Sequence, residues 1–156
     1  MFTKPILIAL VLTLASPALS CTRPAGSAAM AAEVIALINT ERHRAGLAPV
    51  TAEARLTRAA QDHACDSADR GRMGHQSSDG SDLQDRLKRQ GYAFRTAAEN
   101  VAQGHPLPSA VVAGWMASKG HRRNILTKGI TDAGLGLAID AGRDLHWVLN
   151  LGAARN

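Results

Sequence analysis

The last quarter of the chain most constrains what the protein can fold into. Two apolar stretches, residues 132–140 and 145–151, are separated by the polar tetrapeptide Ala-Gly-Arg-Asp at 141–144. A short polar segment with glycine between two such runs predicts an antiparallel β-hairpin. Because nearly every residue of both strands is apolar, both faces of the hairpin must be buried, and helices must cover the sheet.

Helical runs upstream can supply that cover. Apolar residues recur at helical spacing, and capping residues or glycines mark the ends of the runs. The predicted elements are helices over 30–44, about 51–70, 81–91 and 109–116, and one strand over 98–102. Together with the hairpin, this pattern predicts an α+β sandwich in a single domain.

The N-terminus has the features of an export signal. Lys4 precedes an apolar run at 6–14, and small residues follow up to Ser20. The pattern predicts a signal peptide over 1–20, because the run is too short to span a bilayer stably. No second long apolar run follows, so no transmembrane span is predicted. We expect a linker over 21–29, a domain over 30–153, and a protein that is periplasmic or secreted.

The chain has two cysteines, and they allow two interpretations. In one, Ala18-Leu19-Ser20-Cys21 is a lipobox, and a lipidated Cys21 anchors the protein to a membrane. In the other, Cys21 pairs with Cys65 in a disulfide, which requires an oxidising compartment. Both interpretations place the protein outside the cytoplasm.

Composition argues against nucleic acid as a partner. The formal net charge is +5, but aromatic residues make up only 3% of the chain and are not interleaved with the basic ones. Single-stranded nucleic-acid binders usually combine both features. We expect that the protein binds no nucleic acid. We also expect it to be a monomer.

Four polar residues are candidates for a functional site: His75, Glu99, Ser118 and His121. Each lies in a predicted loop or at the end of an element, and His121 is expected on a turn after the fourth helix. Two histidines and a carboxylate can bind a divalent metal or perform acid–base catalysis, and a serine beside them could act as a nucleophile. No short catalytic motif is present, so only the fold could assemble these residues. His63, on an apolar helix face, is interpreted as a packing residue.

Several motifs occur in an order that resembles one family. They are Asn39-Thr40-Glu41-Arg42, Gln61-Asp62-His63-Ala64, Gly74-His75-Gln76-Ser77, Arg86, Gly91-Tyr92, Ala98-Glu99-Asn100-Val101-Ala102, Trp115, Ser118-Lys119-Gly120-His121-Arg122-Arg123-Asn124-Ile125-Leu126 and Gly134-Leu135-Gly136. The ordered set resembles the CAP superfamily (cysteine-rich secretory proteins, antigen 5 and pathogenesis-related proteins), and its short bacterial branch in particular.

The resemblance implies a three-layer α-β-α sandwich with a central, mainly antiparallel sheet and a cleft. In the family, two histidines and two acidic residues line that cleft, and the set binds divalent metal in some members. His75, Glu99 and His121 match three of these positions, so they are the candidate ligands for zinc or magnesium. Ser118 stands where the second acid is usual, and we expect its hydroxyl to cap the helix end instead.

Three functions follow as hypotheses. The first is a module that binds a lipid, a glycan or a peptide in the cell envelope. The second is a metal-dependent or His/Glu-dependent hydrolase. The third is a structural envelope protein, in which the polar residues only hold loops together. Fold alone does not choose among them.

Overall fold

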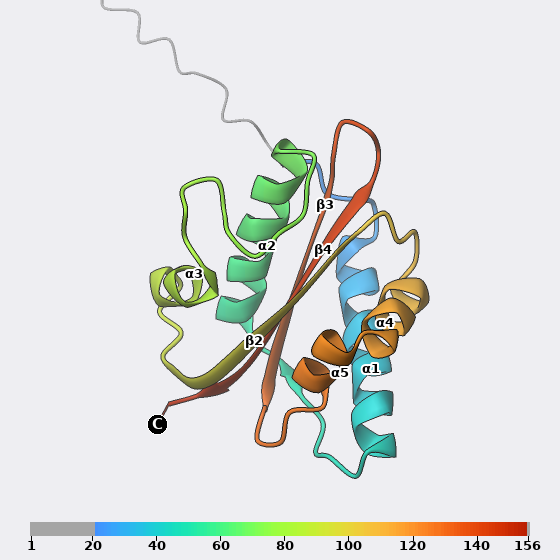
Figure 1. The fold of residues 1–156 in the computed structure, drawn as a ribbon, viewed down its shortest axis with the longest axis vertical. Coiled ribbons are helices and arrows are strands. Elements are labelled where there is room, and N and C mark those ends of the chain that lie inside the picture. The colour runs from blue at the N-terminus through green and yellow to red at the C-terminus, as the bar shows by residue number, and fades with distance from the viewer. Residues whose placement is uncertain (1–20, 156) are drawn as a thin grey trace, which may run out of the picture.

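The computed structural model describes residues 21–155, and the predicted signal peptide lies outside this range. The order of elements is shown in Figure 1. They are α1 Ser27–Arg44, β1 Thr51–Ala52, α2 Ala54–Asp69, α3 Leu83–Arg89, β2 Phe94–Gln103, α4 Pro108–Ala117, α5 Lys119–Ile125, β3 Asp132–Ile139 and β4 Leu145–Ala154.

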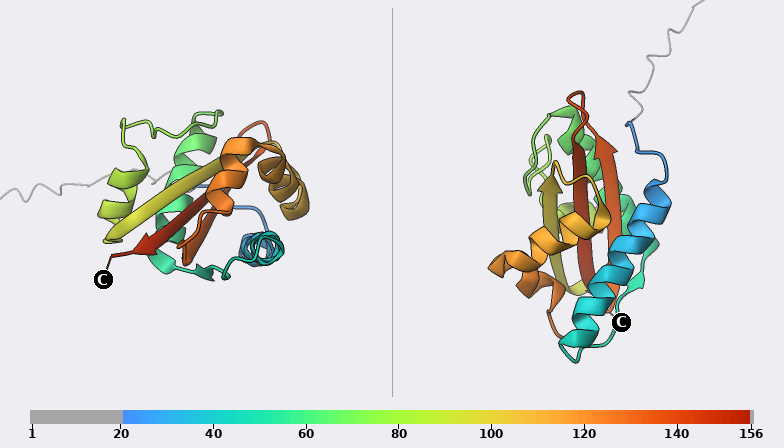
Figure 2. Two further views of the ribbon diagram at one scale, coloured as in Figure 1. Left: turned by 60° about the horizontal axis from the view of Figure 1, so that its bottom comes forward. Right: turned by 90° about the vertical axis from the view of Figure 1, so that its right-hand side faces the viewer.

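The four strands form one sheet in the order β1-β3-β4-β2. The predicted hairpin is confirmed as the antiparallel pair β3 and β4, and β2 runs antiparallel along the other side of β4. Helices α2 and α3 cover one face of the sheet, and α1, α4 and α5 cover the other (Figure 2). The predicted three-layer sandwich is therefore confirmed.

Helix α2 lies directly on the backbone of β3. A Cβ built on Gly134 would lie 2.2 Å from the amide nitrogen of Thr57, and one on Gly136 would lie 2.3 Å from the carbonyl carbon of Ala60. Real Cβ atoms do not approach this closely, so glycine is required at both positions. Without side chains at these two positions, α2 packs closely against the sheet. This close packing also fixes the place where the loop after α2 begins.

The opposite face holds the larger core. Trp115 of α4 and Trp147 of β4 are almost completely buried there, as predicted. Each indole N–H has a main-chain partner: Trp115 donates to the oxygen of Val101 at 3.3 Å, and Trp147 to that of His105 at 2.9 Å. Both tryptophans therefore serve the packing of the fold.

Four predictions about the elements were wrong, two of them because the deciding contacts are distant in sequence. Thr51 and Ala52 form β1 beside β3, whereas a helix start was expected there. Strand β2 spans ten residues, since β4 pairs with it along its whole length.

Helix α1 begins at Ser27, inside the predicted linker. His121 lies within helix α5 and not on a turn, because Ser118 breaks the first helix and a second one starts at once.

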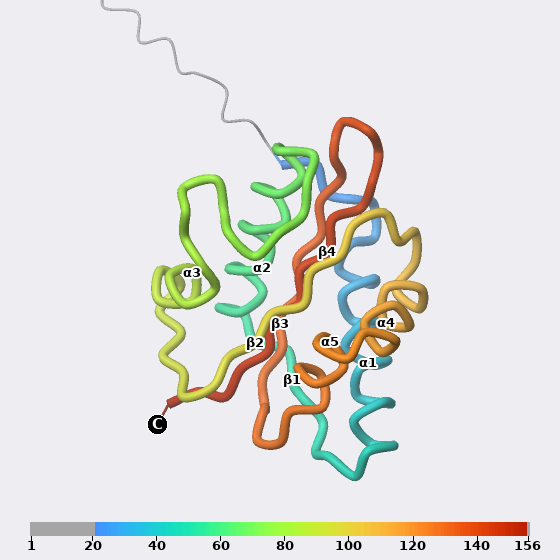
Figure 3. Tube along the Cα trace, viewed as in Figure 1, coloured from blue at the N-terminus to red at the C-terminus, as the bar shows by residue number. Residues whose placement is uncertain are grey.

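Cys21 and Cys65 form a disulfide. It ties the start of the described chain to the C-terminal half of α2, and the two segments lie side by side at one end of the molecule (Figure 3). The amide of Ile139 also donates to the oxygen of Thr22 at 2.9 Å, so the same segment contacts β3. A sulfur in this bond cannot also carry a lipid thioether. None of the helices within residues 21–155 has the length and apolar character needed to cross a membrane.

Candidate functional site

The centre of the candidate site is the carboxylate of Glu99, which has a different partner on each oxygen. Nδ1 of His75 lies 2.9 Å from Oε1, and a nitrogen of the Arg86 guanidinium donates to Oε2 at 2.6 Å. The side chains of Glu99 and Arg86 are 3% and 4% exposed, whereas that of His75 is 62% exposed. The carboxylate thus connects a buried cation with a histidine at the surface.

Arg86 also holds the loop that carries His75. Its second terminal nitrogen donates to the main-chain oxygens of His75 and Ser81 and to Oγ of Ser77, each at 3.1 Å. A planar guanidinium can satisfy several acceptors at fixed angles, which suits it to fixing a loop. The loop is therefore positioned by the same residue that neutralises Glu99.

His63 of α2 fastens the loop from beneath. The ring is fully buried, with Nε2 2.8 Å from the oxygen of Gly74 and Nδ1 3.1 Å from Oγ of Ser77. Burial lowers the pKa of His63 below its usual value, and the positive charge of Arg86 adds to the effect. The prediction that His63 belongs to the packed face of its helix is confirmed.

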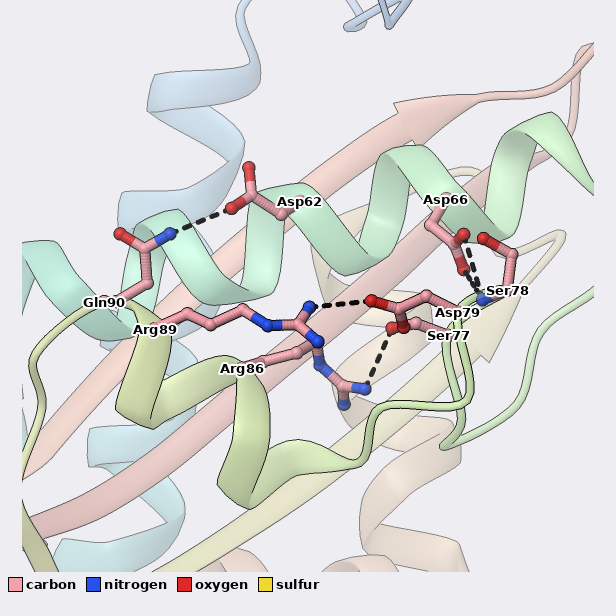
Figure 4. A pocket seen from close by; sticks show the side chains of 8 residues that line it. All are labelled: Asp62, Asp66, Ser77, Ser78, Asp79, Arg86, Arg89 and Gln90. Carbon is pink, nitrogen blue, oxygen red and sulfur yellow. Dashed lines mark hydrogen bonds and ion pairs between the residues drawn. The ribbon is translucent and has the colours of Figure 1, made fainter.

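The outer side of the loop is attached to α2 and α3 around a small polar hollow of about 190 Å³ (Figure 4). The carboxylate of Asp66 accepts from the amide of Ser78, and Arg89 forms an ion pair with Asp79 at 2.9 Å. Asp66 and Arg89 thus each bind a residue of the loop. The side chains around the hollow therefore hold the loop in place.

Helix α5 approaches β2 from the other helical layer. Asn124 donates to the main-chain oxygen of Glu99 at 3.1 Å and to Oδ1 of Asn100 at 2.9 Å. Asn100 in turn donates to the oxygen of His121 at 3.1 Å. The two asparagines thus tie α5 to β2, beside the segment that carries Glu99.

The histidines on the two sides differ in electrostatic environment. The hydrogen bond to Glu99 raises the pKa of His75 above its usual value. Burial lowers the pKa of His121, and the positive charge of His75 lowers it further. A proton on His75 thus disfavours a second proton on His121. His75 takes up a proton more readily than His121.

A cleft of about 380 Å³ opens beside the His75–Glu99 pair. Its lining is apolar at Leu83, Phe94 and Ala97 and polar elsewhere. The polar residues are His75, Gln76, Asp82, Gln84, Glu99 and Asn124. Residues from the loop, α3, β2 and α5 therefore share one concave surface.

Ser118 is not among the residues that line this cleft. It lies at the junction of α4 and α5, where its amide donates to the oxygens of Gly114 and Trp115, and its oxygen accepts from the amide of Arg122. The hydroxyl makes no capping hydrogen bond, so the predicted cap is wrong. The main chain satisfies both helix ends at this residue.

The arrangement does not fit a metal held by His75, Glu99 and His121. Both carboxylate oxygens of Glu99 already accept strong hydrogen bonds, one of them from a cation. Within residues 21–155, no group of three or more His, Cys, Asp or Glu side chains is placed to hold a metal ion. Glu99 has instead the geometry of a residue that orients the His75 ring. The geometry thus gives the predicted zinc or magnesium site no support, and a metal titration is its test.

Sequence reasoning missed the roles of Arg86 and Asn124. Arg86 looks like an ordinary polar residue of a short helix, and Asn124 follows two arginines that draw attention to charge. The only signal for either was its place in the ordered set of motifs. Their partners, at positions 75, 77, 81, 99 and 100, become visible only in the folded chain.

Comparison with known sequences gives a family and two relatives. The family model described as the cysteine-rich secretory protein family, CAP, matches residues 35–151. The Bacillus subtilis protein YkwD is 36% identical over 113 residues, which are 72% of this chain and 44% of YkwD. The B. subtilis membrane protein YlbC is 30% identical over 105 residues, 67% of this chain and 30% of YlbC. The chain thus spans less than half the length of these curated relatives.

Solved structures agree with the fold. An extracellular protein with an SCP domain from Bacillus anthracis has a TM-score of 0.72 at 28% identity, covering 81% of this chain and 41% of that one. An outer surface protein from Borrelia burgdorferi has a TM-score of 0.78 at 16% identity, covering 87% and 100%. The second likeness shows the fold alone.

The family match covers most of the described chain and includes His75, Glu99, Arg86 and His121. The ordered motifs, the three-layer sandwich and this match lead to one conclusion: the chain belongs to the cysteine-rich secretory protein (CAP) family, in its bacterial type.

Proposed function

We propose that this protein is an exported binding module, and that the cleft beside His75 and Glu99 takes a small polar ligand of the cell envelope, a peptide or a glycan segment. The observation that carries the proposal is the lining of the cleft. Its volume of about 380 Å³ lies at the small end of the range for ligand sites, and six of its nine lining side chains are polar. The side chains of His75, Gln76 and Gln84 are exposed and can bond to polar groups of a ligand, while Leu83 and Phe94 contact its apolar parts.

The set of residues that line the cleft favours binding over hydrolysis. A general base needs a free carboxylate or imidazole within reach of a substrate proton. The carboxylate of Glu99 is buried and bonded on both oxygens, which leaves the exposed ring of His75 as the candidate base. The nine lining residues include no Ser, Thr or Cys that could act as a nucleophile beside it. A hydrolase remains the second hypothesis, and a purely structural protein the third.

Three observations support export. Residues 1–20 have the pattern of a signal peptide. The Cys21–Cys65 disulfide is typical of an oxidising compartment. The similar proteins include an extracellular protein of B. anthracis and an outer surface protein of B. burgdorferi. We infer a location outside the cytoplasmic membrane.

The test is a ligand titration monitored by ¹⁵N NMR. Three probes are compared: a disaccharide–peptide fragment of peptidoglycan, a chito-oligosaccharide, and micelles of phosphatidylglycerol. We expect one of the first two to shift the amide signals of Phe94, Ala97 and Asn124. Leu83→Asp should abolish the shifts, because it places a charge on the apolar wall of the cleft. Leu107→Asp is the matched control, since Leu107 is 58% exposed and lies outside the cleft.

Shifts caused by the micelles alone would contradict the proposal of a polar ligand. Cleavage of either soluble probe by the purified protein, abolished by His75→Ala, would replace binding with the hydrolase hypothesis.

A further inference from the structure

Strand β2 is the outer strand of the sheet, so one of its edges has no neighbouring strand among residues 21–155. Outward-facing N–H and C=O groups on such an edge can pair with another chain. Two outward carbonyls of β2 are already satisfied by side chains: that of Glu99 by Asn124 at 3.1 Å and that of Val101 by Trp115 at 3.3 Å. The C-terminal half of the edge is thus covered by α4 and α5.

The next outward position toward the start of β2 is Ala97. It pairs in register with Gly152, whose oxygen accepts from the amide of Thr131 on the other side of β4. Opposite residues of an antiparallel pair either exchange both hydrogen bonds or turn both groups away from each other. The N–H and C=O of Ala97 therefore both point away from β4, as do those of Glu99 and Val101.

The main chain of Ala97 is left open on that edge. In the chain from residue 21 to 155, no loop, helix or side chain supplies a hydrogen bond to its outward N–H or C=O. The register shift between Phe94 and Thr96 ends the regular edge on the other side. The open section is therefore short, and it is bounded by a bulge and by Asn124.

This open section is part of the cleft already described. Ala97 lines it together with Phe94, Glu99 and Asn124. The side chain of a residue paired with Ala97 would lie on the same face of the sheet as that of Ala97 itself. On this face it would enter the cleft between Leu83, Phe94 and His75.

We propose that the cleft binds an extended peptide by β-strand addition at Ala97. One peptide residue exchanges both main-chain hydrogen bonds with Ala97, and its side chain enters the cleft. Main-chain pairing of this kind supplies affinity, while the side-chain pocket supplies selectivity. The amides of Gln76 and Gln84 suit the neighbouring peptide groups, since each can donate and accept. Asn124 can only accept, through Oδ1, because its amide nitrogen already donates to Glu99 and Asn100. The inference rests on the proposed function and adds the ligand class and its binding mode.

The test uses a panel of capped pentapeptides, Ac-Thr-Thr-Xaa-Thr-Thr-NH₂, with the central residue varied. The affinity of each is measured by calorimetric titration. The tightest binder is then N-methylated at Xaa, which removes the hydrogen that would bond to Ala97. We expect about a tenfold loss of affinity, as for one main-chain hydrogen bond whose partner is left buried.

The matched protein variants are Ala97→Pro and Ala97→Val. Proline removes the outward N–H, and valine keeps it while adding similar bulk. Proline is tolerated on edge strands where the N–H faces away from the ladder, so the sheet should survive. We expect Ala97→Pro to bind the chosen pentapeptide at least about tenfold more weakly than Ala97→Val does, since only proline loses the bond. Thermal unfolding verifies that both variants fold, and if Ala97→Pro does not, the N-methylated peptide with the wild-type protein decides.

The outcomes separate the two proposals. Equal affinities for the N-methylated and parent peptides would overturn strand addition and leave the binding cleft intact. Binding of the oligosaccharide but of no pentapeptide would overturn it as well. If neither pentapeptides nor the two soluble envelope fragments bind, the proposed function fails together with the inference.

Discussion

Glu99 shows how a single side chain can serve both structure and site. Its ion pair with Arg86 is almost wholly buried, so neither charge could lose the other without a large penalty. The remaining oxygen faces the surface and holds His75. Because Arg86 also binds the loop, the carboxylate, the guanidinium and the loop form one unit. The orientation of His75 therefore depends in part on Arg86, which does not line the cleft.

The pKa of His75 should be higher than that of a free histidine, and the pKa of His121 should be lower. We expect ring signals of His75 in an NMR titration to move at higher pH than usual, and those of His121 at lower pH. Glu99→Gln should bring the pKa of His75 down, because an amide does not stabilise the charged ring as a carboxylate does. An unchanged titration of His75 in that variant would show that Glu99 does not control it.

The same shifts predict how stability depends on pH. The folded-state pKa of His75 is raised, so its contribution is present below the usual histidine pKa and is lost as pH rises through the raised value. His63 has a lowered pKa, so its contribution is present above the usual value and is lost as pH falls through the lowered one. The free energy of unfolding, measured in urea between pH 5 and 8, should fall with rising pH through the His75 contribution in the wild type. In the control variant Glu99→Gln this contribution should be absent.

Among the elements, α2 and β3 make the tightest contact. The two glycines of β3 leave room for the helix backbone, and the small residues Ala59, Ala60 and Ala64 face the sheet. This contact sets the height of α2 above the sheet and thus the position of His63. The loop that carries His75 therefore depends on the contact between α2 and β3, in which no candidate site residue takes part.

Gly136→Ala should destabilise the protein by about 1–3 kcal/mol or more, because the added methyl group meets the backbone of α2. Gly120→Ala is the control: a Cβ there meets nothing within 4 Å, and alanine is favoured over glycine in a helix. We expect a lower thermal midpoint for the first variant and an equal or higher one for the second. Equal midpoints for Gly136→Ala and the wild type would mean that α2 moves away at little cost.

At the scale of the molecule, long-range links fasten the two helical layers to the sheet. Arg42 of α1, 1% exposed, donates to the oxygens of Ile125, Thr127 and Ile130 at 2.7, 3.1 and 3.0 Å. It fixes the connection between α5 and β3, as Arg86 fixes the loop on the other side. The disulfide adds a covalent link between the N-terminal segment and α2.

Breaking the disulfide should cost about 2–4 kcal/mol, because the closed loop restricts the unfolded chain. The two cysteines are 44 positions apart, which makes the loop long. Cys21→Ser, Cys65→Ser and the double variant should lose the same stability in urea unfolding, since each change removes the same bond. A larger loss for Cys21→Ser than for the double variant would contradict this account. The mass of the exported wild-type protein should include the disulfide and no attached acyl groups.

The sequence by itself determined the features that depend on neighbouring residues. Apolar runs around a four-residue turn gave the β3–β4 hairpin, and helical spacing gave the helices that cover it. The burial of both tryptophans and of His63 followed from the faces on which they lie. The order of the motifs indicated the family, because it records many positions at once.

Only the tertiary structure decided the features that depend on distant partners. The full length of β2 requires β4, some 50 positions away in register, and β1 exists only because β3 lies beside it. The choice of the disulfide belongs to the same group. The start of α5 at Lys119 depends instead on main-chain bonds of Ser118 to residues 114, 115 and 122, which the sequence pattern did not reveal. The double role of Arg86 is the clearest case, since one guanidinium bonds to four residues that no local pattern connects. Local propensity sets what each segment can become, whereas a buried polar group must find partners wherever the fold places them.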